Sequence, residues 1–116
     1  MPRHDADLRL RHMLDAAREA VQMIQGRTRA DLDADRLLNL SLVRLLEIVG
    51  EAASRVPADE RAKCPGIPWA QIVDLRNRLI HGYDSVDFDI LWQIVTQDLP
   101  TLIEELAKIL SSGPRS

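Results

Sequence analysis

Hydrophobic residues recur every three or four positions along most of the chain, which is the period of an amphipathic α-helix. The first apolar stripe predicts a helix over residues 6–25 that stops at Gly26. A second stripe predicts a helix over residues 36–56, and its aspartate N-cap candidates are Asp31, Asp33 and Asp35. This second helix is apolar around most of its circumference, so we expect it to be buried on more than one side. Gly50 in its middle indicates a close helix crossing.

An irregular connection is predicted at residues 57–68, because three of the six prolines fall there. We expect one helical turn within it, at residues 58–63. Pro68 suits the first turn of a third main helix over residues 68–81. Gly82 can end that helix.

The last predicted helix spans residues 87–110, and Asp87 can cap its start. Pro100 removes one backbone donor from it, which predicts a kink. Four main helices joined by short or medium connections, with one additional short helical turn, indicate an all-α, up-and-down bundle.

The length of 116 residues predicts a single domain over residues 1–116, with an ordered core at about 6–110. The helices at 36–56 and 87–110 have more apolar surface than a lone small bundle needs. This surplus favours a partner chain, most simply a twofold homodimer. The alternative is that both helices lie in the centre of a monomer.

The composition excludes several classes of protein. Hydrophobic residues make up 46% of the chain and charged residues 28%, which fits neither a disordered tail nor a membrane protein. The absence of a membrane-length apolar run and of a secretory apolar segment, together with the single Cys64, predicts a cytoplasmic protein. The net charge of −3 argues against a general nucleic-acid coat, so any nucleic-acid contact needs a local basic patch.

Most catalytic patterns are missing from the sequence. It contains no H-E-x-x-H, no glycine-rich phosphate loop and no cysteine pair, and we predict neither a metal site nor a bound cofactor. A di-metal bundle would need a glutamate three residues before a histidine, but those positions hold Met1, Arg9 and Arg78. His4 and His12 are expected to be surface residues, and Cys64 an incidental, partly buried thiol.

Residues 75–83 concentrate the candidate chemistry, with Arg76, Asn77, Arg78, His81 and Tyr83 close together. A helix through His81 would place Asn77 and His81 on one face and separate Arg76 from His81 by roughly 140°. A histidine beside an arginine suits phosphodiester chemistry. The imidazole moves a proton near neutrality, and the guanidinium binds phosphate and stabilises growing negative charge.

Each of these side chains also has a purely structural alternative. His81 could bond the last carbonyls of the helix, and Tyr83 could pack against its neighbours. Arg76 and Arg78 could form ion pairs with nearby carboxylates, of which the candidates are Asp74, Glu47 and Glu51.

Residues 76–83, R-N-R-L-I-H-G-Y, resemble the R-x-x-x-x-H-x-Y motif of HepT-like toxins, which belong to the HEPN superfamily. Residues 46–53, L-E-I-V-G-E-A-A, are similar to the L-E-I-I-G-E-A-A stretch of that family. Ile67–Trp69 before the motif, and residues 91–95 and 98–100 after it, also fit. The resemblance covers the chain from the first predicted helix to the end of the last one.

This resemblance implies a helical HEPN fold and a metal-independent endoribonuclease toxin of a HepT/MntA-type toxin–antitoxin pair. The implied reaction is attack of an RNA 2′-hydroxyl on the adjacent phosphate. His81 would transfer protons, Arg76 would hold the phosphate, and Asn77 would orient His81 or the phosphate. The resemblance also implies a homodimer, or a higher homo-oligomer, with two motifs facing each other across one cleft.

The antitoxin implied by the resemblance is a nucleotidyltransferase that transfers AMP from ATP to Tyr83. The AMP group would occupy the site that an RNA phosphate needs. Two other functions stay open at the level of sequence. One is a non-catalytic helical module that dimerises or docks the nucleotidyltransferase. The other is a nucleotide-binding bundle, which lacks an obvious set of base-stacking residues.

Overall fold

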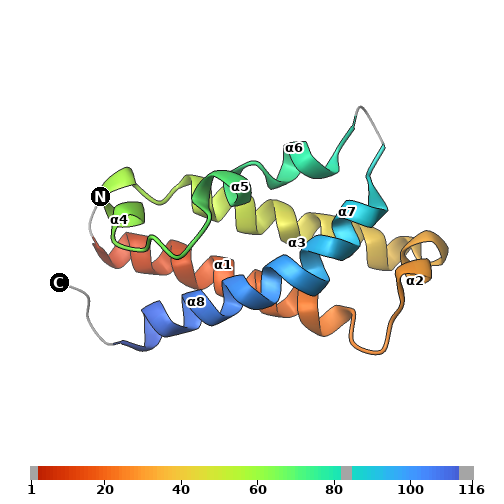
Figure 1. The fold of residues 1–116 in the computed structure, drawn as a ribbon, viewed down its shortest axis with the longest axis horizontal. Helices are drawn as coiled ribbons and strands as arrows, with labels where there is room; N and C mark the ends of the chain where they lie inside the picture. Colours follow the sequence, from red (N-terminus) through yellow and green to blue (C-terminus); the bar gives the residue numbers. More distant parts are fainter. Residues whose placement is uncertain (1–2, 82–84, 113–116) are drawn as a thin grey trace.

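The computed structural model describes residues 3–81 and 85–112, and in this part of the chain the secondary structure is helical apart from one isolated bridge (Figure 1). The long helices are α1 (Arg3–Met23), α3 (Arg36–Ser54) and α8 (Leu99–Ser111). The short ones are α2 (Arg29–Ala34), α4 (Ala58–Ala62), α5 (Trp69–Val73), α6 (Leu75–Leu79) and α7 (Phe88–Gln93), with a π-helical turn, η1 (Ile94–Asp98), between α7 and α8.

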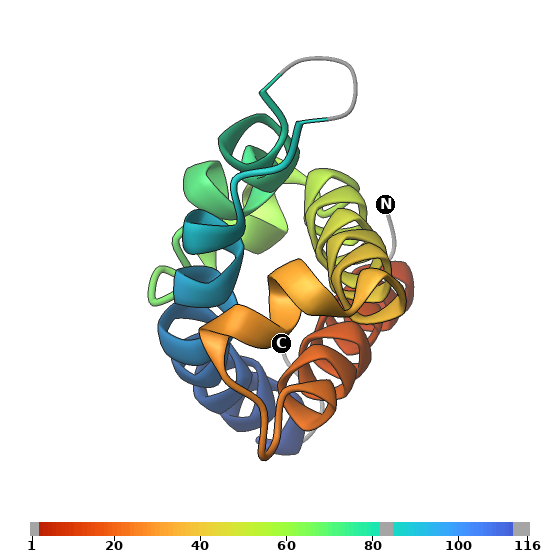
Figure 2. The same cartoon turned by 90° about the vertical axis from the view of Figure 1, so that its right-hand side faces the viewer.

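The main elements surround one hydrophobic core, which confirms the predicted all-α bundle. Seen end-on, α1, α3, the α5–α6 segment and the α7–η1–α8 segment occupy four sides of the molecule, and α2 crosses one end (Figure 2). The largest fully buried side chains come from all of these parts and include Leu10, Leu42, Leu46, Leu79, Leu91, Ile94 and Leu106. Among the described residues, no helix has the length and hydropathy of a membrane span.

Gly50 marks a close approach between α3 and α5, as predicted. A Cβ atom added at Gly50 would lie 3.1 Å from the carbonyl oxygen of Ile72, which is tighter than an ordinary contact. The absence of a side chain therefore allows α5 to pack directly on the backbone of α3.

The predicted helix at 68–81 is wrong in its length and continuity. The structure divides it at Asp74 into α5 and α6, and α6 ends at Leu79. Ile80 is extended and forms an antiparallel bridge with Val86. The N–H of Asp87 donates to the carbonyl of Leu79 at 2.9 Å. This pairing of the chain with itself replaces the helical hydrogen bonds that would continue α6.

The irregularity expected at Pro100 takes the form of η1. The N–H of Leu99 donates to the carbonyl of Ile94, five residues earlier, which is the π-helical pattern. In a regular helix Pro100 would have no N–H for the carbonyl of Thr96, and its ring would clash there. The wider turn just before the proline relieves that conflict.

The segment before α3 holds a helix that the periodicity did not predict. α2 begins after Thr28, whose N–H donates to the Asp31 carboxylate at 2.7 Å. Buried Asn39 donates to the carbonyl of Leu32 at 2.8 Å and ties α2 to α3. Asp35 caps α3 as predicted by accepting from the N–H of Leu38 at 3.0 Å, and this bond lowers the pKa of Asp35.

Candidate active site

A groove of about 380 Å³ lies between α3 and the α5–α6 segment, and two of the predicted site residues line it. We call it the α3–α6 groove. From α3 it is lined by Arg44, Leu46, Glu47, Gly50, Glu51 and Ser54, and from the other side by Val73, Arg76 and Asn77. Two arginines and two glutamates therefore share one concave surface. Its floor is formed where α3 and α5 pack closely at Gly50.

Arg76 is exposed, and its side chain has no hydrogen bond or ion pair with any described residue. Of the carboxylates considered for it, Glu51 and Asp74 have other partners, and no ion pair joins Glu47 to Arg76 among the described residues. Glu51 binds Arg55, with Oε1 3.0 Å from the Arg55 Nη2, and Asp74 accepts from Asn77. The guanidinium of Arg76 is thus available to an anion in the groove, which is what phosphate binding requires.

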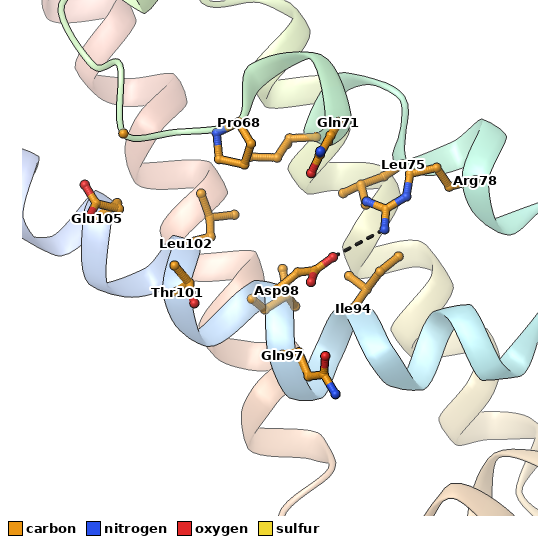
Figure 3. A pocket seen from close by; sticks show the side chains of 13 residues that line it. Pro68, Gln71, Leu75, Arg78, Ile94, Gln97, Asp98, Thr101, Leu102 and Glu105 are labelled. Atoms are coloured by element: carbon orange, nitrogen blue, oxygen red, sulfur yellow. Dashed lines mark hydrogen bonds and ion pairs between the residues drawn. The ribbon is translucent and has the colours of Figure 1, made fainter.

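Arg78 is held on the other side of α6 (Figure 3). Its Nη2 lies 3.3 Å from Asp98 Oδ2, and both side chains line a separate pocket of about 210 Å³ between the α5–α6 segment and η1–α8. Arg78 does form an ion pair with a carboxylate, as its structural alternative predicted. The partner, however, is Asp98 and not Asp74, Glu47 or Glu51. This ion pair connects α6 to η1.

Asn77 also has a different partner from the one expected. Its Nδ2 donates to Asp74 Oδ1 at 2.8 Å, across the junction of α5 and α6. The expectation that Asn77 and His81 share a helical face is wrong, because α6 ends at Leu79. Asn77 instead lies in the α3–α6 groove next to Arg76.

His81 lies beyond α6, so the helical separation of roughly 140° from Arg76 does not apply. Its backbone N–H donates to the carbonyl of Ser85 at 2.7 Å, and not to the helix end. Its Nε2 lies 3.9 Å from Asp87 Oδ2, and 55% of its side chain is exposed. The imidazole is therefore accessible and has a carboxylate beside it.

Asp87 is the residue whose contribution the sequence analysis missed, since it was predicted only as a helix cap. Its Oδ1 does accept from the N–H of Ile90 at 3.0 Å and caps α7. Its Oδ2 faces His81 at the same time. The detectable signal was the short interval between a motif histidine and a capping aspartate, which lets the chain fold back and join them.

Among the described residues, Arg76 and His81 have different local settings. Arg76 lines the α3–α6 groove, whereas His81 follows the end of α6, where its backbone bonds to Ser85 and its side chain faces Asp87. Tyr83 lies outside the described residues. Cys64 is buried, as expected in part, and no three metal-binding side chains cluster within the described part of the chain.

A family model described as Ribonuclease HepT-like matches residues 13–109, which include the α3–α6 groove, His81 and the whole motif. The chain belongs to the HepT-like ribonuclease family. The resemblance drawn from residues 46–53 and 76–83 is confirmed.

Curated relatives agree with this assignment. The HepT-like chain is 35% identical over 100 residues to a protein of Thermococcus cleftensis named probable ribonuclease HepT, which covers 83% of this chain and 91% of the relative. It is 32% identical over 106 residues to a candidate RNase of Methanocaldococcus jannaschii, covering 91% and 97% respectively. A candidate RNase of Caldanaerobacter subterraneus is 33% identical over 101 residues, covering 87% and 90%. No solved structure matches the HepT-like chain significantly.

Proposed function

We propose that this chain is a metal-independent endoribonuclease and the toxin of a toxin–antitoxin pair. Membership of the HepT-like ribonuclease family supports an activity on RNA. The single observation that carries the proposal to this site is the guanidinium of Arg76, which lies in the α3–α6 groove without a partner among the described residues. An unpaired arginine beside a neutral amide, that of Asn77, is suited to bind one phosphate of an RNA strand.

The proposed reaction needs only groups that the chain itself supplies. A neutral imidazole of His81 accepts the proton of an RNA 2′-hydroxyl as its oxygen bonds to the adjacent phosphorus. The bond from phosphorus to the 5′-oxygen then breaks, and an imidazolium gives that oxygen a proton. The products are a 2′,3′-cyclic phosphate and a 5′-hydroxyl. Arg76 stabilises the charge that grows on the phosphoryl oxygens.

We further propose that two copies of the chain form the complete site. Within one chain Arg76 and His81 lie in different settings, so a second copy would bring the histidine segment of one protomer to the groove of the other. The exposed ridge of α3 that continues from the groove carries Leu37 and Leu40, whose exposed fractions are 77% and 51%. A twofold contact at the start of this ridge would cover both leucines and leave its Arg44–Glu51 part open.

Regulation would act on Tyr83, two residues beyond His81 in the motif. In this proposal the tyrosine oxygen bonds to the α-phosphorus of ATP, held by a nucleotidyltransferase, and pyrophosphate leaves. The AMP phosphate attached there would compete with RNA for Arg76. This part of the proposal rests on the family resemblance and on the position of Tyr83 after His81.

The test is cleavage of a labelled single-stranded RNA oligonucleotide by the purified protein, with and without excess chelator. We expect cleavage that survives the chelator and leaves a 2′,3′-cyclic phosphate. An oligonucleotide with a single ribose in otherwise deoxyribose sequence should be cut only at that ribose, because DNA lacks the nucleophile. Activity that is lost with chelator and restored by magnesium would contradict the mechanism. Binding of a nucleotidyltransferase without any cleavage would favour the docking module instead.

A further inference from the structure

We propose that a second groove, between α1 and α3, binds a backbone phosphate of RNA at a distance from the bond that is cut. This inference rests on the proposed ribonuclease function and deepens it. The groove has a volume of about 140 Å³. We call it the α1–α3 groove. Its polar lining consists of Arg9 and His12 from α1, Arg44 and Glu51 from α3, and the α3 C-cap residue Arg55.

The positive charge in this groove is not balanced by the chain. Glu51 is the one carboxylate among its described lining residues, and it is bound to Arg55. The side chains of Arg9 and Arg44 form no hydrogen bond or ion pair with any described residue. Their two guanidinium groups share one small hollow, where a bound anion would reduce their mutual repulsion.

Arg9 supplies the observation that points most directly to a ligand. Its Nε is buried from solvent and has no acceptor among the described residues. A buried N–H donor without an acceptor is costly, and native proteins rarely leave one unsatisfied. As placed, this Nε is covered. A rotation of the Arg9 side chain toward the groove would let a phosphate oxygen accept from it while its other oxygens face Arg44 and Arg55, because a guanidinium donates in a forked geometry.

The α1–α3 groove adjoins the α3–α6 groove. Arg44 and Glu51 line both of them, and they lie on the exposed ridge of α3 two turns apart. Figure 2 shows α3 between α1 and the α5–α6 segment on one side of the molecule, so the grooves flank the same helix. An RNA strand that crosses α3, whose diameter with side chains is about 10–12 Å, would place one phosphate beside Arg76 and another beside Arg9.

Charge and chemistry favour a phosphate over a base in this groove. The two grooves together carry four arginines against two glutamates, in a chain whose net charge is −3. The described lining of the α1–α3 groove contains no aromatic ring on which a base could stack, and its apolar members are only Ile48 and Ala52. The groove therefore fits the repeating, sequence-independent part of RNA.

The experiment measures the binding of a fluorescent single-stranded RNA oligonucleotide in a His81→Ala background, which keeps the probe intact. The double variant Arg9→Gln/Arg55→Gln removes the proposed contacts, and Arg18→Gln is the matched control, since Arg18 is exposed on α1 and lines neither groove. We expect the slope of log Kd against log salt concentration to decrease by about 0.7 in the double variant, the value for one lost contact to single-stranded RNA. The control should keep the slope. Arg9→Lys with Arg55→Lys should keep most of it, because the charge remains.

A dinucleotide probe separates the two grooves, since its one phosphodiester cannot reach both. Its cleavage by the protein with intact His81 should be insensitive to the Arg9→Gln/Arg55→Gln change and lost with Arg76→Gln. An unchanged salt slope in the double variant, with circular dichroism showing the native fold, would overturn the phosphate subsite alone. A decrease of the salt slope in Arg18→Gln equal to that in the double variant would overturn it too. So would a loss of dinucleotide cleavage in the double variant equal to that in Arg76→Gln. If the unmodified protein neither binds nor cuts RNA, the ribonuclease function fails and the subsite fails with it.

Discussion

The imidazole of His81 faces the carboxylate of Asp87, with Nε2 3.9 Å from Oδ2, across the two segments that flank residues 82–84. Asp87 is fixed in place by a second task, because its Oδ1 caps α7 through the N–H of Ile90. The helix cap thereby holds the carboxylate beside the imidazole. One aspartate connects the start of α7 to the end of the motif.

Replacing Asp87 with Asn should separate these two tasks. Asparagine caps a helix about as well as aspartate, so the thermal midpoint should stay close to that of the original chain. The cleavage rate should decrease about 1.4- to fivefold, since a partly exposed charged pair contributes roughly 0.2–1 kcal/mol. Steady-state kinetics on a single-stranded RNA measures this. In a His81→Ala background Asp87→Asn should cause no further loss, and an equal loss there would show that Asp87 does not act through His81.

Arg76→Ala and His81→Ala should each lower RNA cleavage by about 10²–10⁴-fold. Both residues are exposed, so the free energy of unfolding should change by no more than about 0.5 kcal/mol. Arg18→Ala, at an exposed position of α1, serves as the control and should leave the rate unchanged. Rates are compared with urea unfolding curves of the same preparations. If His81→Ala removes activity only by unfolding the protein, the histidine has a structural role.

Tyr83→Phe should retain cleavage and escape AMP transfer, because it removes only the acceptor oxygen. The measurement is intact-protein and peptide mass spectrometry after incubation with the cognate nucleotidyltransferase and ATP. The unmodified chain should gain AMP at Tyr83, and cleavage should decline in parallel. AMP on another residue would contradict the proposed regulation.

Gly50→Ala should destabilise the protein by about 1 kcal/mol. Alanine gains about 1 kcal/mol in helix propensity, but overpacking against a fixed neighbour costs about 1–3 kcal/mol. The neighbour here is the carbonyl oxygen of Ile72, 3.1 Å from the new Cβ, and it cannot turn aside as a side chain would. Chemical denaturation measures the difference, with Ser54→Ala on the same helix as the control. A stabilised Gly50→Ala variant would show that α5 can withdraw from α3 without cost.

Asp35 should make α3 more stable at neutral pH than in acid. Its pKa in the folded chain is lowered from the ordinary value of 3.8, first by the N–H of Leu38 and then by Arg27. Its contribution is therefore present above that value and is lost as the pH falls through the lower pKa of the folded state. Urea unfolding at several pH values should show Asp35→Asn to be less stable than the original chain at neutral pH. The difference should shrink in acid, and a constant difference would exclude this titration.

The parts of the fold that depend on local pattern could be predicted from the sequence. α1 and α3 follow their three- and four-residue apolar periods, Asp35 and Asp87 cap the expected helices, and Gly50 marks the expected crossing. The motif residues were also identified by their order in the sequence. These features are determined by neighbours within a few turns of each helix.

The geometry of the site could not be predicted in the same way, because it depends on contacts between separate segments. The apolar pattern before His81 continues like a helix, yet Val86 and Asp87 pair with Ile80 and Leu79 and end α6. α2 was missed because its single buried leucine gives too little periodicity, and its position depends on Asn39. The α3–α6 groove exists only once α5 and α6 pack on α3.

The ion pair between Arg78 and Asp98 links η1 to α6, the helix that carries Arg76 into the α3–α6 groove. α6 has only five residues, so it has little stability of its own, and its direction is set by the burial of Leu75 and Leu79 and by this one charged contact. Arg76 is carried on the same short helix. A substitution at Asp98, which lies outside the α3–α6 groove, would thus alter the position of the Arg76 guanidinium in that groove. Selection that maintains the position of Arg76 would therefore also act on Arg78 and Asp98.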